Sequence, residues 1–159
     1  MHPDDEEPGG RIDILDSTHL LSEPELHWIR VKGEQALSTL GATGEVRVRV
    51  LSDEGMAHAH ETYSRVPGPT DVLTFDLRAP GAADLDADLL IGLEVARREA
   101  LARGHAVRDE VLLYVIHGIL HCLGHDDTAD DSSARMHAEE DRVLEQIGVG
   151  ARYAKEARP

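Results

Sequence analysis

Residues 111–127 read VLLYVIHGILHCLGHDD, and this stretch determines the expected fold and chemistry of the chain. Its apolar residues recur at spacings of three and four, as in a helix that buries a broad face. His117 and His121 are four residues apart, so both rings project from one side of that helix. Gly124 supplies a helix stop, because glycine tolerates the left-handed conformation found at many helix ends. The stretch therefore predicts a buried helix that carries two imidazoles and then turns.

Three further potential metal ligands, His125, Asp126 and Asp127, follow the helix stop. Two imidazoles on a rigid helix and a third ligand from a turn are the components of a three-ligand catalytic zinc site. A single histidine on an apolar helix is usually a hydrogen-bonded core residue, but this pair with its acidic turn favours a metal site. The His-Glu-x-x-His helix of zinc proteases has a glutamate base directly after its first histidine. Gly118 stands there in this chain, which argues against a protease of that type.

The composition is that of one acidic domain. The chain has 159 residues, enough for a domain with a real hydrophobic core. Its 16 Lys and Arg against 31 Asp and Glu give a net charge of −15, whereas RNA binding relies on clustered positive charge. An RNA substrate would need a local basic groove; otherwise the acidity indicates a salt-adapted or strongly solvated surface.

The cysteine content and the absence of long apolar segments favour a cytoplasmic protein. Cys122 is the only cysteine, so no intrachain disulfide forms, and a buried thiol is a better expectation for it than a metal ligand. We see no signal peptide and no apolar run near the ~20 residues that span a bilayer.

Periodicity along the chain predicts a single α/β (α+β) domain over residues 11–159, after a disordered, acidic tail at 1–10. We expect a small mixed sheet of about four strands packed against helices, with the helix of the histidine pair as the central and most buried one. The expected strands are 11–15, 46–50, 72–75 and 89–91, with a loop at 79–87. The other expected helices are 22–41, capped by Ser22, 52–63, capped by Ser52, 93–102, stopped by Gly104, and a last one capped by Ser132 or Ser133 and stopped by Gly148.

Charged residues on these elements leave two interpretations open. Arg47 and Arg49 alternate with valines, so they form either a solvated strand face, which we favour slightly, or a basic stripe for phosphates. The acidic residues within 137–141 on the last helix are expected on a solvated face, with one as an extra ligand the lesser alternative. The densest basic cluster lies either on an ordinary exposed helix face, which we favour modestly, or in contact with RNA; it consists of Arg97, Arg98, Arg103 and Arg108.

The histidine stretch resembles the YbeY family of bacterial endoribonucleases, whose motif reads His-Gly-x-Leu-His-x-x-Gly-x-Asp-His with the three histidines as metal ligands. His117 and His121 fall on the first two ligands, Asp126 on the aspartate, and Asp127 on the third histidine. A second stretch resembles the family's Tyr-Arg-x-x-x-x-Pro-Thr-Asp-Val-Leu-Ser-Phe: Pro69, Thr70, Asp71, Val72, Leu73 and Phe75 match in register. The family's functional arginine falls on Ser64, and Arg65 is one place later. The resemblance covers most of residues 45–147.

The resemblance implies a zinc-dependent, single-strand endoribonuclease that acts in ribosomal RNA maturation and ribosome quality control. We expect one Zn²⁺ per chain, held by His117, His121 and Asp127, with a fourth position for a water whose pKa falls towards ~7 so that it attacks a phosphodiester. Arg65 is the candidate for neutralising phosphate. His125 is the candidate for proton transfer or for replacing Asp127 as the third ligand. The expected partners are ribosomal RNA and the small ribosomal subunit or its associated proteins.

Two other functions remain open. One is a metal-dependent hydrolase of another substrate, such as a small phosphoester, which the net charge of −15 favours. The other is a non-catalytic, ribosome-associated metal-binding protein, which Asp127 and Ser64 favour because both stand at positions that the family uses. A carboxylate at 127 is compatible with zinc and also with a harder metal.

Overall fold

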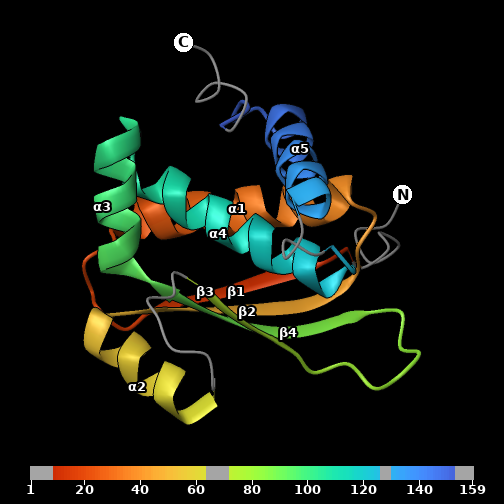
Figure 1. Cartoon of the computed structure of the whole chain (residues 1–159), viewed down its shortest axis with the longest axis horizontal. Coiled ribbons are helices and arrows are strands. Elements are labelled where there is room, and N and C mark those ends of the chain that lie inside the picture. Colours follow the sequence, from red (N-terminus) through yellow and green to blue (C-terminus); the bar gives the residue numbers. More distant parts are fainter. Residues whose placement is uncertain (1–8, 64–71, 126–129, 153–159) are drawn as a thin grey trace, which may run out of the picture.

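A four-stranded mixed sheet supports the helices of this protein, as the computed structural model shows (Figure 1). The structure describes residues 9–63, 72–125 and 130–152. The strands follow the order β1-β2-β4-β3; β1, β2 and β4 run parallel, and β3 is antiparallel to β4. Their bounds are β1 Arg11–Asp16, β2 Gly44–Leu51, β3 Val72–Asp76 and β4 Leu85–Gly92. The predicted small mixed sheet is confirmed.

Five helices lie among the described residues, and most of them cover one face of the sheet. In Figure 1, α1, α3, α4 and α5 lie on one side and α2 on the other. The bounds are α1 Glu23–Thr39, α2 Asp53–Tyr63, α3 Leu93–Arg103, α4 Val107–Cys122 and α5 Asp130–Gln146. None of the helices in the described part of the chain is long and apolar enough to cross a membrane.

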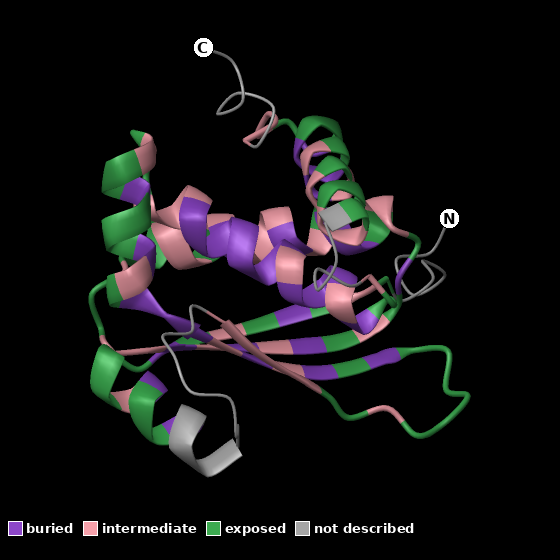
Figure 2. Ribbon diagram, viewed as in Figure 1, coloured by how far each residue is buried: buried purple, intermediate pink, exposed green. Residues whose placement is uncertain are grey.

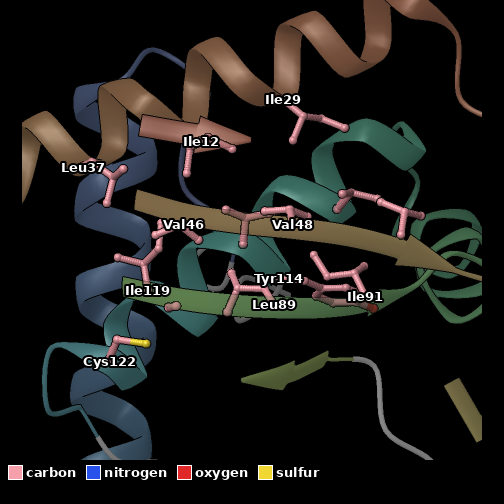
Figure 3. Packing of buried hydrophobic residues seen from close by; sticks show 14 of the residues in the cluster. Ile12, Ile29, Leu37, Val46, Val48, Leu89, Ile91, Tyr114, Ile119 and Cys122 are labelled. Carbon is pink, nitrogen blue, oxygen red and sulfur yellow. The ribbon is translucent and has the colours of Figure 1, made fainter. Parts of the chain in front are cut away.

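The alternation of side chains along the strands places the core between the sheet and α4. Val46, Val48 and Val50 of β2 are buried, and their register partners on β4 include the buried Leu89 and Ile91. Figure 3 shows residues of these strands and of α1 packed with Tyr114 and Ile119 of α4. Burial of such apolar surface contributes roughly 25 cal/mol per Å².

Helix α4 is the centre of the fold, as predicted. Eleven of its 16 residues are buried, and Figure 2 shows it as the most continuously buried helix. It packs against α1, α3 and α5 as well as β3 and β4. Because neighbouring elements enclose α4 on several sides, its backbone is held in place, and so are the starting points of the side chains that it carries.

Several predicted helix ends match the structure because the capping residues act on the neighbouring backbone. Ser22 and Glu25 form a reciprocal capping box at the start of α1, and Ser52 Oγ accepts a hydrogen bond from Gly55 N at 3.1 Å at the start of α2. Gly104 directly after α3, and Gly124 and Gly148 two residues past the ends of α4 and α5, have positive φ.

Two predicted boundaries were wrong. Strand β4 begins at Leu85, inside the expected 79–87 loop, because Leu85 and Ala87 are buried while Asp86 and Asp88 face arginine. Helix α5 begins by Asp130, so Ser132 and Ser133 lie within it and do not cap it. Of the expected tail, residues 1–8 lie outside the described residues.

A buried carboxylate closes the turn after β1. Asp16 Oδ1 accepts a hydrogen bond from Thr18 N, and Oδ2 accepts one from Leu21 N, both at 2.9 Å. Burial raises the pKa of Asp16, but the hydrogen bonds from Thr18 and from backbone amides outweigh burial, so its pKa lies below the ordinary value.

Candidate metal centre

The two histidines of α4 face one another at the end of the helix nearest Gly124. His117 Nε2 and His121 Nε2 lie 3.1 Å apart, and the ring centroids are 4.7 Å apart with the planes at 80°. The spacing of four residues places both rings on one side of the helix. The structure therefore brings together the first two ligands predicted from the sequence.

This geometry fits a single metal ion. Two nitrogens bound to one tetrahedral zinc at ~2.0–2.1 Å lie roughly 3.3 Å apart, close to the observed 3.1 Å between the two Nε2 atoms. Imidazole nitrogen is a ligand type that zinc prefers. Among residues 9–63, 72–125 and 130–152, no third His, Cys, Asp or Glu forms a ligand cluster with the pair.

Of the remaining predicted site residues, only His125 belongs to the described part of the chain. Asp127 and Arg65 lie outside the described residues, as do Asp126 and Ser64, so their roles stay predictions. His125 is described and half-buried, and its backbone N–H donates to Leu120 O at 3.0 Å.

His125 is near α5. Hydrogen bonds from Arg142 are the main cause of the lowered pKa of Glu139, and the charge of His125 adds a smaller contribution. His125 is therefore close enough to Glu139 for an electrostatic interaction. The proposed roles of His125 in proton transfer or metal binding also stay predictions.

A carboxylate from α5 contacts His117. Glu140 Oε1 lies 2.7 Å from His117 Nδ1, and the Glu140 side chain is fully buried. The neighbours of Glu140 differ in position: Glu139 is partly exposed and pairs with Arg142, and Asp141 accepts a hydrogen bond from Arg152 N. The expected solvated acidic face is therefore wrong for Glu140. Its sequence signal was its place in the apolar stripe of α5, which Met136, Val143 and Leu144 define.

A cleft of about 460 Å³ opens beside the histidine pair. Strand β3 forms one wall through four of its residues, and α4 supplies the other side. The cleft is lined by Val72, Leu73, Thr74, Asp76, His117, His121 and Cys122. Since β3 is an edge strand of the sheet among the described residues, the cleft lies along that edge of the sheet.

Gly118 sets the distance between α4 and the sheet under this cleft. A Cβ at this position would lie 2.7 Å from Leu89 Cδ2 and 3.2 Å from Thr74 Oγ1. Both distances are shorter than ordinary van der Waals contact. The position next to His117 therefore has no room for the glutamate of a zinc protease, which supports the sequence argument against that class.

Cys122 lines the cleft as a neutral thiol. It is 5% exposed, and burial, with a smaller contribution from Asp76, raises its pKa to about 11. Arg78 lies at the same end of α4, where its guanidinium donates to Cys122 O and to Asp76 Oδ2. These bonds satisfy a carbonyl at the helix C-terminus and lower the pKa of Asp76.

The arginines on the sheet are neutralised by carboxylates. Arg47 Nε lies 2.5 Å from Asp88 Oδ1 and Nη2 lies 2.5 Å from Asp86 Oδ1, while Arg49 pairs with Asp13 at 3.1 Å. The alternative of a basic stripe for phosphates is therefore not supported for these two side chains. Arg103 of the predicted basic cluster likewise pairs with Glu110, and Arg108 stacks on Trp28 with its Cζ 4.2 Å from the ring centroid.

Comparison with known proteins identifies the family. A model of the family described as Endoribonuclease YbeY matches residues 22–148, which include the histidine pair and Glu140. The chain belongs to the YbeY family. An Endoribonuclease YbeY of Synechococcus sp. (strain CC9605) is 34% identical over 145 residues, covering 83% of this chain and 86% of the relative. That of Kineococcus radiotolerans is 37% identical over 123 residues, covering 72% of this chain and 70% of the relative.

A solved structure agrees with the fold of this YbeY family member. The solution structure of a Thermotoga maritima protein matches with a TM-score of 0.62 at 24% sequence identity, over 86% of this chain and 88% of that one. At this identity the match supports the α+β architecture alone.

Proposed function

We propose that this chain is a zinc-dependent endoribonuclease that cleaves single-stranded ribosomal RNA in the cytoplasm, during rRNA maturation and ribosome quality control. The observation that carries the proposal is the pair of Nε2 atoms 3.1 Å apart beside the cleft at the edge of the sheet. Membership of a family whose relatives are named endoribonucleases supports the reaction class. The small ribosomal subunit or its associated proteins are the proposed partners.

The proposed ligands are His117, His121 and Asp127, with His125 as the alternative third ligand. When bound, zinc supplies a Lewis acid that makes water nucleophilic near neutral pH. In the hydrolysis, the oxygen of water forms a bond to phosphorus, one P–O ester bond breaks, and the leaving oxygen takes a proton. The products are a phosphomonoester end and a hydroxyl end. Arg65 is proposed to neutralise the phosphate and His125 to carry the proton.

The cleft favours an extended, flexible strand over a duplex. It lies along β3, whose outer edge has no neighbouring strand among the described residues. The residues that line it mix apolar side chains with the two imidazoles, so phosphate contacts on this wall are few. We therefore expect a shallow dependence of RNA affinity on salt, because each phosphate contact contributes about 0.7 to the salt slope for single strands.

The test measures zinc and cleavage on the same preparations. Protein stripped with EDTA is reloaded with one equivalent of zinc and given a fluorescent single strand of ribosomal sequence or the same strand annealed to its complement. Wild type is expected to bind about one zinc per chain and to cut the single strand alone. The His121→Ala variant is expected to lose stoichiometric zinc and cleavage. Cleavage at the wild-type rate by His121→Ala, purified in the same way, would contradict the proposal.

Matched variants identify the third ligand and control for histidine loss. His27→Ala removes an exposed histidine of α1 and should retain zinc and cleavage. Elemental analysis of Asp127→Ala and His125→Ala tests which residue is the third ligand. Loss of zinc in Asp127→Ala, with zinc retained in His125→Ala, would establish a His-His-Asp set. Co-sedimentation with small ribosomal subunits tests the partner.

A second candidate, hydrolysis of small phosphoesters, is favoured by the pairing of Arg47, Arg49 and Arg103 with carboxylates, which removes them as phosphate contacts. A higher kcat/KM for bis(4-nitrophenyl) phosphate than for the RNA strand would support it.

A further inference from the structure

Glu140 occupies a place in the fold where an isolated carboxylate is costly. It belongs to the apolar stripe of α5, since Met136, Val143 and Leu144 stand four before, three after and four after it, and all three are buried. Glu140 itself is 0% exposed. Burying a charged group requires partners that replace its hydration. A glutamate at this position therefore needs an explanation that packing does not provide.

The partners of Glu140 point to the histidine pair. Its Oε1 lies 2.7 Å from His117 Nδ1 across 23 residues of sequence, and its Oε2 has no hydrogen-bond partner within the described part of the chain. Glu110 on α4 is a second glutamate that is 0% exposed. Both oxygens of Glu110 are bonded, by His105 at 2.6 Å and Arg103 at 3.3 Å. Protein groups satisfy both oxygens of Glu110, whereas residues in the described part of the chain satisfy only one oxygen of Glu140.

The Glu140 contact determines which nitrogen of His117 carries a proton. A carboxylate accepts and does not donate, so Nδ1 of His117 is the donor, and the lone pair of the neutral ring lies on Nε2. Nε2 is the atom that faces His121 Nε2 at 3.1 Å. Histidines that bind metals usually donate their other ring N–H to a carboxylate or carbonyl, which sets the tautomer and the ring orientation.

We propose that Glu140 is a positioning residue of the metal site: its carboxylate keeps His117 in the Nδ1-protonated tautomer and directs Nε2 towards the ion that His121 shares. This inference rests on the proposed zinc site. A cation on Nε2 also places positive charge on the far side of the imidazole from Glu140, which balances a carboxylate that the described residues satisfy through one oxygen only.

The experiment compares wild type with Glu140→Gln and Glu140→Leu, and with Glu110→Gln as the matched control. Gln keeps an oxygen that accepts the Nδ1 proton, and Leu removes the acceptor while suiting the apolar stripe. Glu110→Gln alters a second buried glutamate–histidine pair, seven residues or about 10 Å along α4 from His117. Zinc affinity is measured by competition with a chromophoric chelator, and Co²⁺ absorption reports the ligand geometry. The tautomer of His117 in metal-free protein is measured by long-range ¹H–¹⁵N NMR.

The expected result is a 10–100-fold weaker zinc affinity for Glu140→Leu, the size typical for loss of such an outer partner. Metal-free Glu140→Leu should also lose the preference for the Nδ1-protonated tautomer. Glu140→Gln should keep that tautomer and recover part of the affinity. Glu110→Gln should lower the melting temperature and leave zinc affinity unchanged.

The outcomes separate this role from the proposed function. Zinc affinity and a Co²⁺ spectrum in Glu140→Leu equal to those of wild type would overturn the role of Glu140 and leave the zinc site in place. Wild type that binds no zinc would overturn the proposed function and this role with it. If Glu140→Leu does not fold, the nearly isosteric Glu140→Gln decides: a zinc affinity and a Co²⁺ spectrum equal to those of wild type in this folded variant would contradict the role.

Discussion

Replacing Gly118 by alanine tests the packing that fixes the histidine pair over the cleft. The added Cβ would lie 2.7 Å from Leu89 Cδ2 and 3.0 Å from Cδ1. Carbon atoms in contact prefer about 3.5–4.0 Å, so Leu89 or α4 must move by roughly 1 Å. Leu89 is 0% exposed and has little room. Overpacking typically costs 1–3 kcal/mol, and alanine recovers about 1 kcal/mol of helix propensity.

We therefore expect Gly118→Ala to lower the free energy of unfolding by about 1 kcal/mol, which corresponds to a melting temperature lower by roughly 2–4 °C for a chain of this size. Urea unfolding followed by circular dichroism measures the change. The double mutant with Leu89→Ala separates the causes, because removing the Leu89 methyls removes the clash. In that background Gly118→Ala should be neutral or stabilising, with a coupling of about 0.5–3 kcal/mol. Gly118→Ala that stabilises the otherwise wild-type protein by about 1 kcal/mol would refute the close packing.

Three further predictions follow from charges and burial. Burial raises the pKa of Asp16, but the hydrogen bonds that it accepts from Thr18 and Leu21 hold this pKa below its ordinary value. The Asp16 carboxylate therefore stabilises the fold above the ordinary pKa of an aspartate, and this effect is lost as the pH falls through the folded pKa. The difference in the free energy of unfolding between wild type and Asp16→Asn, measured by urea titration, should therefore shrink from pH 6 to pH 3. A difference that stays constant over this range would contradict the stabilising role of the Asp16 carboxylate. Arg47→Gln should cost about 1 kcal/mol of stability and leave the rate of RNA cleavage unchanged, because carboxylates already neutralise Arg47; a slower rate with intact zinc would show phosphate contact. Since burial raises the pKa of Cys122 to about 11, iodoacetamide at pH 8 should label the native thiol at least ~10-fold more slowly than the urea-unfolded thiol, and equal rates would contradict its burial.

Because the chain is acidic, little positive charge is available on the protein to attract RNA. The net charge is −15, and arginines on the sheet and on α3 are paired with carboxylates. Positive charge from a bound cation at His117 and His121 would then be a large part of the attraction for phosphate. Removal of zinc should weaken RNA binding as well as abolish cleavage. Fluorescence anisotropy of a labelled strand, with and without EDTA, measures this effect.

Local sequence signals determined the elements of this protein. Valine alternation predicted β2, and the capping residues Ser22 and Ser52 predicted the starts of α1 and α2, because the period of a strand and the chemistry of a cap involve only neighbouring residues. The spacing of His117 and His121 predicted a shared face in the same way, and the structure confirms it. Their roles as ligands, like that of Asp127, stay predictions.

Tertiary structure decided what lies between the elements. Glu140 meets His117 across 23 residues, and Arg47 meets Asp88 across 41, pairings that no period within either segment specifies. In the sequence, Gly118 argued only against a zinc protease, and the structure shows that α4 lies close to Leu89 at this position. Such contacts depend on how the packed elements align with one another. This alignment is a property of the whole core, because the stable arrangement is the one with few buried voids and few unpaired charges. A sequence read element by element contains the proposed ligands, and only the packed fold places the Glu140 carboxylate beside His117.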